Sequence, residues 1–160
     1  MSMAMRPHRV AGWLLCGLLG LAGVAEARPI DRRSGELGVG AIFGSPTAVS
    51  GKLWLGGGNA VDAALGWDFV VGELRLHADY LWHWFNVTKV EKGRLPLYIG
   101  VGGSLSLGNR AEFGVRVPLG IAYHFANAPV EIFLEVAPGL RLSPSTGAMA
   151  QGGIGGRYYF

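Results

Sequence analysis

Apolar and polar side chains alternate along most of the chain, from Ser34 to the last residue, Phe160. The alternation is clearest over residues 112–126, where every second side chain is large and apolar and those between are small or polar. Residues two apart share one face of a β-strand, whereas an α-helix repeats every 3.6 residues. The pattern therefore predicts an all-β chain, and no segment shows a helical stripe of useful length.

Turn-forming residues divide this region into segments of about ten residues, each with the composition of a strand. We expect eight strands, at 35–44, 48–56, 60–70, 74–85, 95–108, 112–126, 130–142 and 148–160. Pro118 and Pro138 fall inside two of them, and each removes one hydrogen bond from the ladder between strands. The longest connection is polar and covers residues 86–94.

Alternation alone does not say which face of the sheet points inward. An eight-stranded barrel is just wide enough inside for side chains, and the apolar faces hold more large residues than that space admits. The opposite faces are rich in glycine, and aromatic residues gather near segment ends, as in the girdles of membrane barrels. Ten residues also suit a tilted membrane strand, and a bilayer admits no unpaired strand edge. We therefore predict an eight-stranded antiparallel up-and-down transmembrane β-barrel.

The beginning of the chain has the layout of a secretory signal peptide. A basic start at Arg6 and Arg9 precedes a run of 15 uncharged, apolar residues, and the small-x-small motif Ala-Glu-Ala follows. The run is shorter than the ~20 residues of a spanning helix, which disfavours a membrane anchor. We expect residues 1–27 to be a signal peptide cleaved after Ala27, and residues 28–160 to form the barrel domain.

Composition narrows the function classes. The chain is 50% hydrophobic and 16% charged, with 27 glycines. Loss of residues 1–27 would remove Cys16, the one cysteine, and would leave 12 Lys+Arg against 10 Asp+Glu, because two arginines and one glutamate lie in that segment. Disulfides, a thiolate nucleophile and cysteine-bound metals are thereby excluded from the mature chain. The balanced charge also argues against nucleic-acid binding.

The final residues, Gly155-Gly156-Arg157-Tyr158-Tyr159-Phe160, form an alternating strand with a terminal aromatic. With the signal peptide and eight alternating segments, the chain resembles the small eight-stranded outer-membrane β-barrel proteins of Gram-negative bacteria, of which the OmpA transmembrane domain and OmpX are typical. The resemblance implies an outer-membrane location, contact with outer-membrane lipid, and recognition of Tyr158 and Phe160 by the barrel-assembly machinery. We expect a monomer. The family has long loops outside the cell, whereas the connections here are short and the longest falls on the periplasmic side.

If the polar faces line the barrel interior, five cations and six anions gather there. Buried charges persist only when they are paired, so we expect a salt-bridge network that fills and stiffens the lumen. Its expected members are Glu36, Lys52, Asp62, Asp68, Arg75, Asp79, Arg116, Glu131, Glu135, Arg141 and Arg157.

The candidates for metal binding and catalysis are few. His77, Asp79, His83 and His124 fall on lumen faces, and a metal site would need at least three of these side chains to converge. His83 lies roughly 20 Å along the strand from His77 at ~3.3 Å per residue, so we expect ordinary hydrogen bonding instead. The lipid-facing side lacks the base and acid of a hydrolase. We expect no enzyme activity, no cofactor, and no catalytic, cofactor-binding or metal-ligating residue.

The sequence thus favours an outer-membrane barrel with a filled polar lumen and a structural or interaction role. Three alternatives stay open: a narrow channel for ions or small solutes, a lipid-modifying outer-membrane enzyme, and a soluble periplasmic carrier of apolar ligands, similar to a lipocalin. The last of these would place the apolar faces inside the barrel.

Overall fold

The computed structural model describes residues 35–85, 87 and 90–160, and this part of the chain consists of strands and connections. The strands are β1 (Leu37–Ser45), β2 (Thr47–Gly56), β3 (Asn59–Asp68), β4 (Glu73–Trp84), β5 (Leu97–Leu107), β6 (Ala111–Arg116), β7 (Leu119–His124), β8 (Val130–Ser143) and β9 (Gly147–Tyr159). No helix in the described ranges is long and apolar enough to cross a membrane. The expected signal peptide, residues 1–27, and the start of the barrel domain lie outside the described residues.

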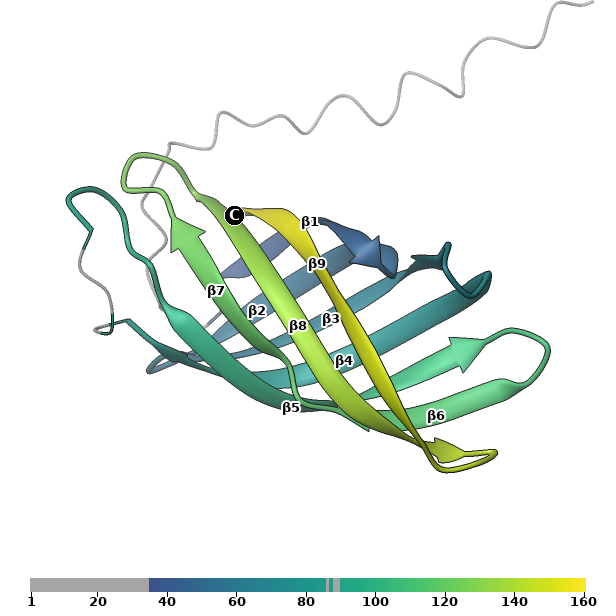
Figure 1. The fold of residues 1–160 in the computed structure, drawn as a ribbon. Coiled ribbons are helices and arrows are strands. Elements are labelled where there is room, and N and C mark those ends of the chain that lie inside the picture. The colour runs from purple at the N-terminus through teal and green to yellow at the C-terminus, as the bar shows by residue number, and fades with distance from the viewer. Residues whose placement is uncertain (1–34, 86, 88–89) are drawn as a thin grey trace, which may run out of the picture.

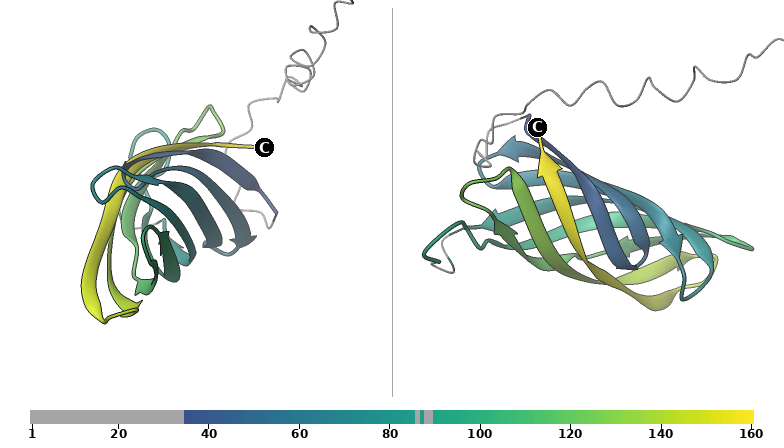
Figure 2. Two further views of the ribbon diagram at one scale, coloured as in Figure 1. Left: turned by 90° about the vertical axis from the view of Figure 1, so that its right-hand side faces the viewer. Right: turned by 90° about the horizontal axis from the view of Figure 1, so that it is seen from above.

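The sheet closes on itself (Figure 1). Every pairing is antiparallel, and β1 pairs with β9 from Gly38 opposite Tyr159 to Ser45 opposite Gly152. On the far side of the ring β4 pairs with β5 over eleven residue pairs, and β7 joins β8. Figure 2 shows the curved sheet from two further directions. The prediction of an all-β, up-and-down barrel with eight strand positions is confirmed.

One of the eight predicted strands is interrupted. The segment expected at 112–126 forms two short strands, β6 and β7, on either side of Val117 and Pro118, so the prediction of one continuous strand there was wrong. The reason is the missing N–H of Pro118, which cannot donate to a neighbouring strand. Hydrogen bonds still connect this break to both neighbouring strands. The Pro118 carbonyl accepts from the N–H of Gly100 on β5, and the Val117 N–H donates to the Pro138 carbonyl on β8.

Alternation decides which side chains point into the barrel. Large apolar residues point outward, with Val136 57% and Phe43 65% exposed, whereas Glu131 and Glu135 on β8 are buried. Inside, Trp54 and Tyr159 form one apolar cluster with Ala60, and Leu81 belongs to a second. The strands therefore have the polarity of a barrel in an apolar surrounding, with polar groups inside.

The two ends of the barrel differ in their connections. The chain enters β1 and leaves β9 at one end, which we call the terminal end, and the long connection between Trp84 and Leu97 lies at this same end. At the other end, which we call the distal end, the connections are Pro46 alone, 69–72, 108–110 and 144–146. The long connection therefore lies at the same end of the barrel as the start of β1 and the end of β9.

Candidate functional site

The charged residues inside the barrel form several linked groups, of which the first centres on Glu131 near the terminal end. This carboxylate lies 3.0 Å from Lys52 Nζ and 2.9 Å from Arg157 Nη1, and it accepts a hydrogen bond of 2.9 Å from the Tyr159 hydroxyl. His124 Nε2 lies 2.8 Å from the same carboxylate. Because Glu131 and Lys52 are both fully enclosed, these contacts replace the water that each charge loses on burial.

Arg157 extends this group toward the middle of the lumen. Its guanidinium donates to Asp62 at 2.9 Å and to the Ser50 hydroxyl at 2.9 Å, in addition to Glu131. The same guanidinium lies 4.0 Å from the centre of the Phe133 ring, a cation–π distance. A planar guanidinium with several fixed donors suits such a junction, because it binds two carboxylates at once.

A second junction, at Arg116, joins β4 to β8. Arg116 forms ion pairs with Glu135 and with Asp79, whose Oδ1 lies 3.3 Å from Arg116 Nε. It also donates to the Gln151 side chain at 2.7 Å. The Tyr98 hydroxyl donates to the other oxygen of Glu135 at 2.9 Å. Two anions therefore share one cation at this level of the barrel.

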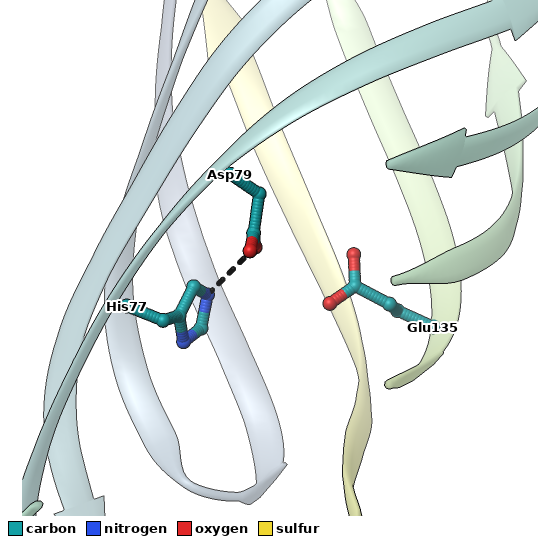
Figure 3. Close-up of side chains that lie close together, drawn as sticks. All are labelled: His77, Asp79 and Glu135. Atoms are coloured by element: carbon teal, nitrogen blue, oxygen red, sulfur yellow. Dashed lines mark ion pairs between the residues drawn. The ribbon is translucent and has the colours of Figure 1, made fainter. Parts of the chain in front are cut away.

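His77 lies beside the two carboxylates of this second junction, Asp79 and Glu135, as Figure 3 shows. Its Nε2 lies 3.9 Å from Asp79 Oδ2 on the same strand, and Glu135 approaches from the opposite wall. The remaining lumen histidines lie elsewhere. His83 contacts Lys52 at 2.9 Å and the Gly58 carbonyl at 3.1 Å, and His124 contacts Glu131.

The distal end of the lumen is more open. Arg75 pairs with Asp68 at 3.1 Å, and Arg141 pairs with Glu112 at 3.1 Å, where both side chains are about one-third exposed. A cavity of about 210 Å³ lies between these pairs, and Ser104 is part of its lining.

Ten charged residues of the expected network form ion pairs in this interior, namely Lys52, Asp62, Asp68, Arg75, Asp79, Arg116, Glu131, Glu135, Arg141 and Arg157. Glu36 lies just before β1, and its backbone carbonyl accepts from the Trp54 N–H. Sequence reasoning placed Glu112 on the lumen face but did not include it in the network. Gln151 and Tyr98 were missed as well, although alternation within their strands would have placed both of them inside. Tyr158 and Phe160, the expected assembly signal, point outward with their ring centres 5.1 Å apart.

Comparison with known proteins supports the fold. The N-terminal β-barrel domain of Pseudomonas aeruginosa OprF superposes with a TM-score of 0.55, over 79% of this chain and 97% of that domain, at 14% sequence identity. No protein-family model and no curated protein sequence matches the chain. The fold and the interior together define a closed antiparallel β-barrel with a charged lumen. Its architecture is similar to that of the OprF barrel domain.

Proposed function

We propose that this chain is an integral β-barrel protein of a Gram-negative outer membrane, with a structural or interaction role and a lumen filled by ion pairs. The observation behind the proposal is the polarity of the wall. Apolar side chains such as Leu134 and Leu140 are half exposed on the outside, while Glu131 and Lys52 are enclosed inside. A protein in water would lose stability from both features, whereas a bilayer favours both.

The filled lumen weighs against the alternatives. A carrier of apolar ligands needs an apolar cavity, but this interior is crossed by the Glu131 and Arg116 junctions. A channel needs a continuous water-filled path, which eight strands leave no room for once side chains fill the interior. Trp54 and Leu81, both fully buried, add to that filling. The short connections at the distal end also leave little surface for a large extracellular partner.

The remaining parts of the proposal concern biogenesis. We propose that residues 1–27 direct export and are cleaved after Ala27, and that the barrel-assembly machinery recognises Tyr158 and Phe160. Both aromatic side chains are accessible, Tyr158 on the outer face of β9 and Phe160 directly after that strand. In the membrane the barrel would contact lipid as a monomer, because its own ring leaves no strand edge unpaired.

The membrane location is tested by cell fractionation followed by gel electrophoresis, with unheated and boiled samples compared. We expect the chain in the outer-membrane fraction and a mobility that changes on boiling, because a closed barrel resists unfolding by detergent at room temperature. Recovery in the soluble periplasmic extract, with no change on boiling, would contradict the proposal and favour the carrier of apolar ligands.

A further inference from the structure

Three potential metal ligands converge inside the barrel at the level of Arg116. His77 and Asp79 are two residues apart on β4 and therefore share its inner face, and Glu135 faces them from β8 (Figure 3). One ligand atom from each side chain lies within 4.8 Å of the other two. The three side chains are all buried, so their arrangement is held by the wall on both sides.

The polar atoms of this cluster are incompletely satisfied within the described residues. The His77 ring is 4% exposed, yet its Nδ1 has no hydrogen-bond partner there. Both carboxylate oxygens of Asp79 also lack hydrogen bonds among the described groups, although Arg116 lies within ion-pair distance. His77 turns Nε2, not Nδ1, toward Asp79 (Figure 3). Buried polar groups in native proteins almost always have a partner, so the unsatisfied Asp79 oxygens beside this ring nitrogen indicate a missing ligand.

The charge balance of the enclosed lumen favours a cation as that ligand. With the histidines neutral, and with the buried Asp68 paired to Arg75, three further enclosed cations face four enclosed anions, which leaves one negative charge in excess. The cations are Lys52, Arg116 and Arg157, and the anions are Asp62, Asp79, Glu131 and Glu135. An uncompensated negative charge away from water is costly, and it favours a cation over an anion or a neutral ligand at this place.

We propose that His77, Asp79 and Glu135 bind one divalent transition-metal ion, with Zn²⁺ the best match. One imidazole and two carboxylates are ligands that Zn²⁺ accepts, and a histidine disfavours Mg²⁺ and Ca²⁺, which select oxygen. A tetrahedral ion with bonds near 2.1 Å needs ligand atoms about 3.5 Å apart, so the side chains close in by about 1 Å. Arg116 and Tyr98, which contact the carboxylates, would then orient the ligands.

The distal cavity gives the ion a way in. Ser104, part of the cavity lining, lies directly opposite His77 in the register of β4 and β5. The cavity of about 210 Å³ therefore reaches the residue paired with His77, although the three ligands are not part of its lining, and its volume is enough for several water molecules. The site depends on the barrel interior alone, so it is independent of the proposed membrane role.

The experiment uses the full chain, isolated in detergent without a polyhistidine tag and stripped with a chelator. Zn²⁺ binding is measured by calorimetry, and Co²⁺ is used as a probe because its visible absorption reports histidine and carboxylate coordination. We expect one ion per chain, and a loss of affinity of at least about tenfold in His77→Gln and in Glu135→Gln, since even an indirect partner of a ligand is worth that much.

The matched control is His83→Gln, another buried lumen histidine on the same strand, whose contacts are to Lys52 and Gly58 and not to the cluster. It should bind Zn²⁺ as the parent does. Each variant is checked for folding by the change in gel mobility on boiling. The two ligand variants lie on different strands, so if one of them fails to fold, the other still tests the site. Absence of Zn²⁺ binding and of the Co²⁺ spectrum in the parent, or unchanged affinity in a folded ligand variant, would overturn the site.

Discussion

At the scale of single residues, Glu131 is the side chain on which most of the lumen contacts converge. Lys52, Arg157, Tyr159 and His124 all approach this one carboxylate within 3.0 Å. Removing one partner of a buried ion pair leaves the other charge uncompensated, which costs far more than the pair contributes when it is intact. We call Glu131 with these four contacts the Glu131 hub, and a conservative substitution of Glu131 should lower the stability of the barrel most.

Glu131→Gln keeps the shape of the side chain and removes its charge, so Lys52 and Arg157 lose a shared anion. We expect the free energy of unfolding to fall by about 3–5 kcal/mol. The measurement is a urea titration of the barrel in lipid vesicles, followed by tryptophan fluorescence. Glu112→Gln is the matched control, because its pair with Arg141 is partly exposed and should contribute less than about 1 kcal/mol. Equal losses in the two variants would show that the Glu131 hub is not special.

Residue types and alternation were enough to predict which charges face the lumen, but not which charges meet. Arg157 binds Asp62, which is 95 residues away in the sequence, and Glu135 reaches Asp79 and His77 from the opposite wall. These meetings depend on the stagger between strands, which a period of two does not determine. For the same reason, the metal ligands considered from the sequence were His77, Asp79 and two other histidines. The position of Glu135 beside His77 was not predicted.

At the scale of elements, the strands and their order could be predicted because each strand has its own repeating pattern. The division of the 112–126 segment could not, since the apolar alternation continues through Val117 and Leu119 without a break. Pro118 was the one local signal, but Pro138 stays within a continuous β8, opposite Ala150. The effect of a proline thus depends on the hydrogen bonds that its position requires, and those are a property of the assembled sheet.

The outward face of β7 tests the proposed contact with lipid. Leu119 is 39% exposed on that face and lies opposite Val136, near the middle of β8. Arginine in a lipid-facing position near mid-membrane costs about 2–4 kcal/mol, so Leu119→Arg should lower the unfolding free energy in vesicles by that amount. Leu107→Arg, an outward position at the end of β5, is the control and should cost about 0–1 kcal/mol. If Leu119→Arg folds as stably as the parent, the outer face does not contact lipid.

At the scale of the whole molecule, closure depends on the seam between β1 and β9. The two strands are rich in glycine where they meet, and the register places Gly40 opposite Arg157 and Gly44 opposite Gly153. A methyl group on Gly40 would collide with the Gly156 carbonyl oxygen and would lie 2.7 Å from the Arg157 Cα. Glycine is needed here because the backbones approach closely, and any side chain would push the seam apart.

Gly40→Ala should therefore weaken the closed barrel, although it changes only one methyl group. Overpacking of this kind costs about 1–3 kcal/mol, and here the cost falls on the pairing that completes the ring. We expect the unheated gel band of the closed form to weaken, and the temperature at which the band shifts to fall. Gly51→Ala is the matched control on β2, because a methyl group there would meet nothing nearer than 3.9 Å. If both variants keep the parent's transition temperature, the seam is looser than the close approach of its backbones implies, and closure rests mainly on the ion pairs inside the lumen.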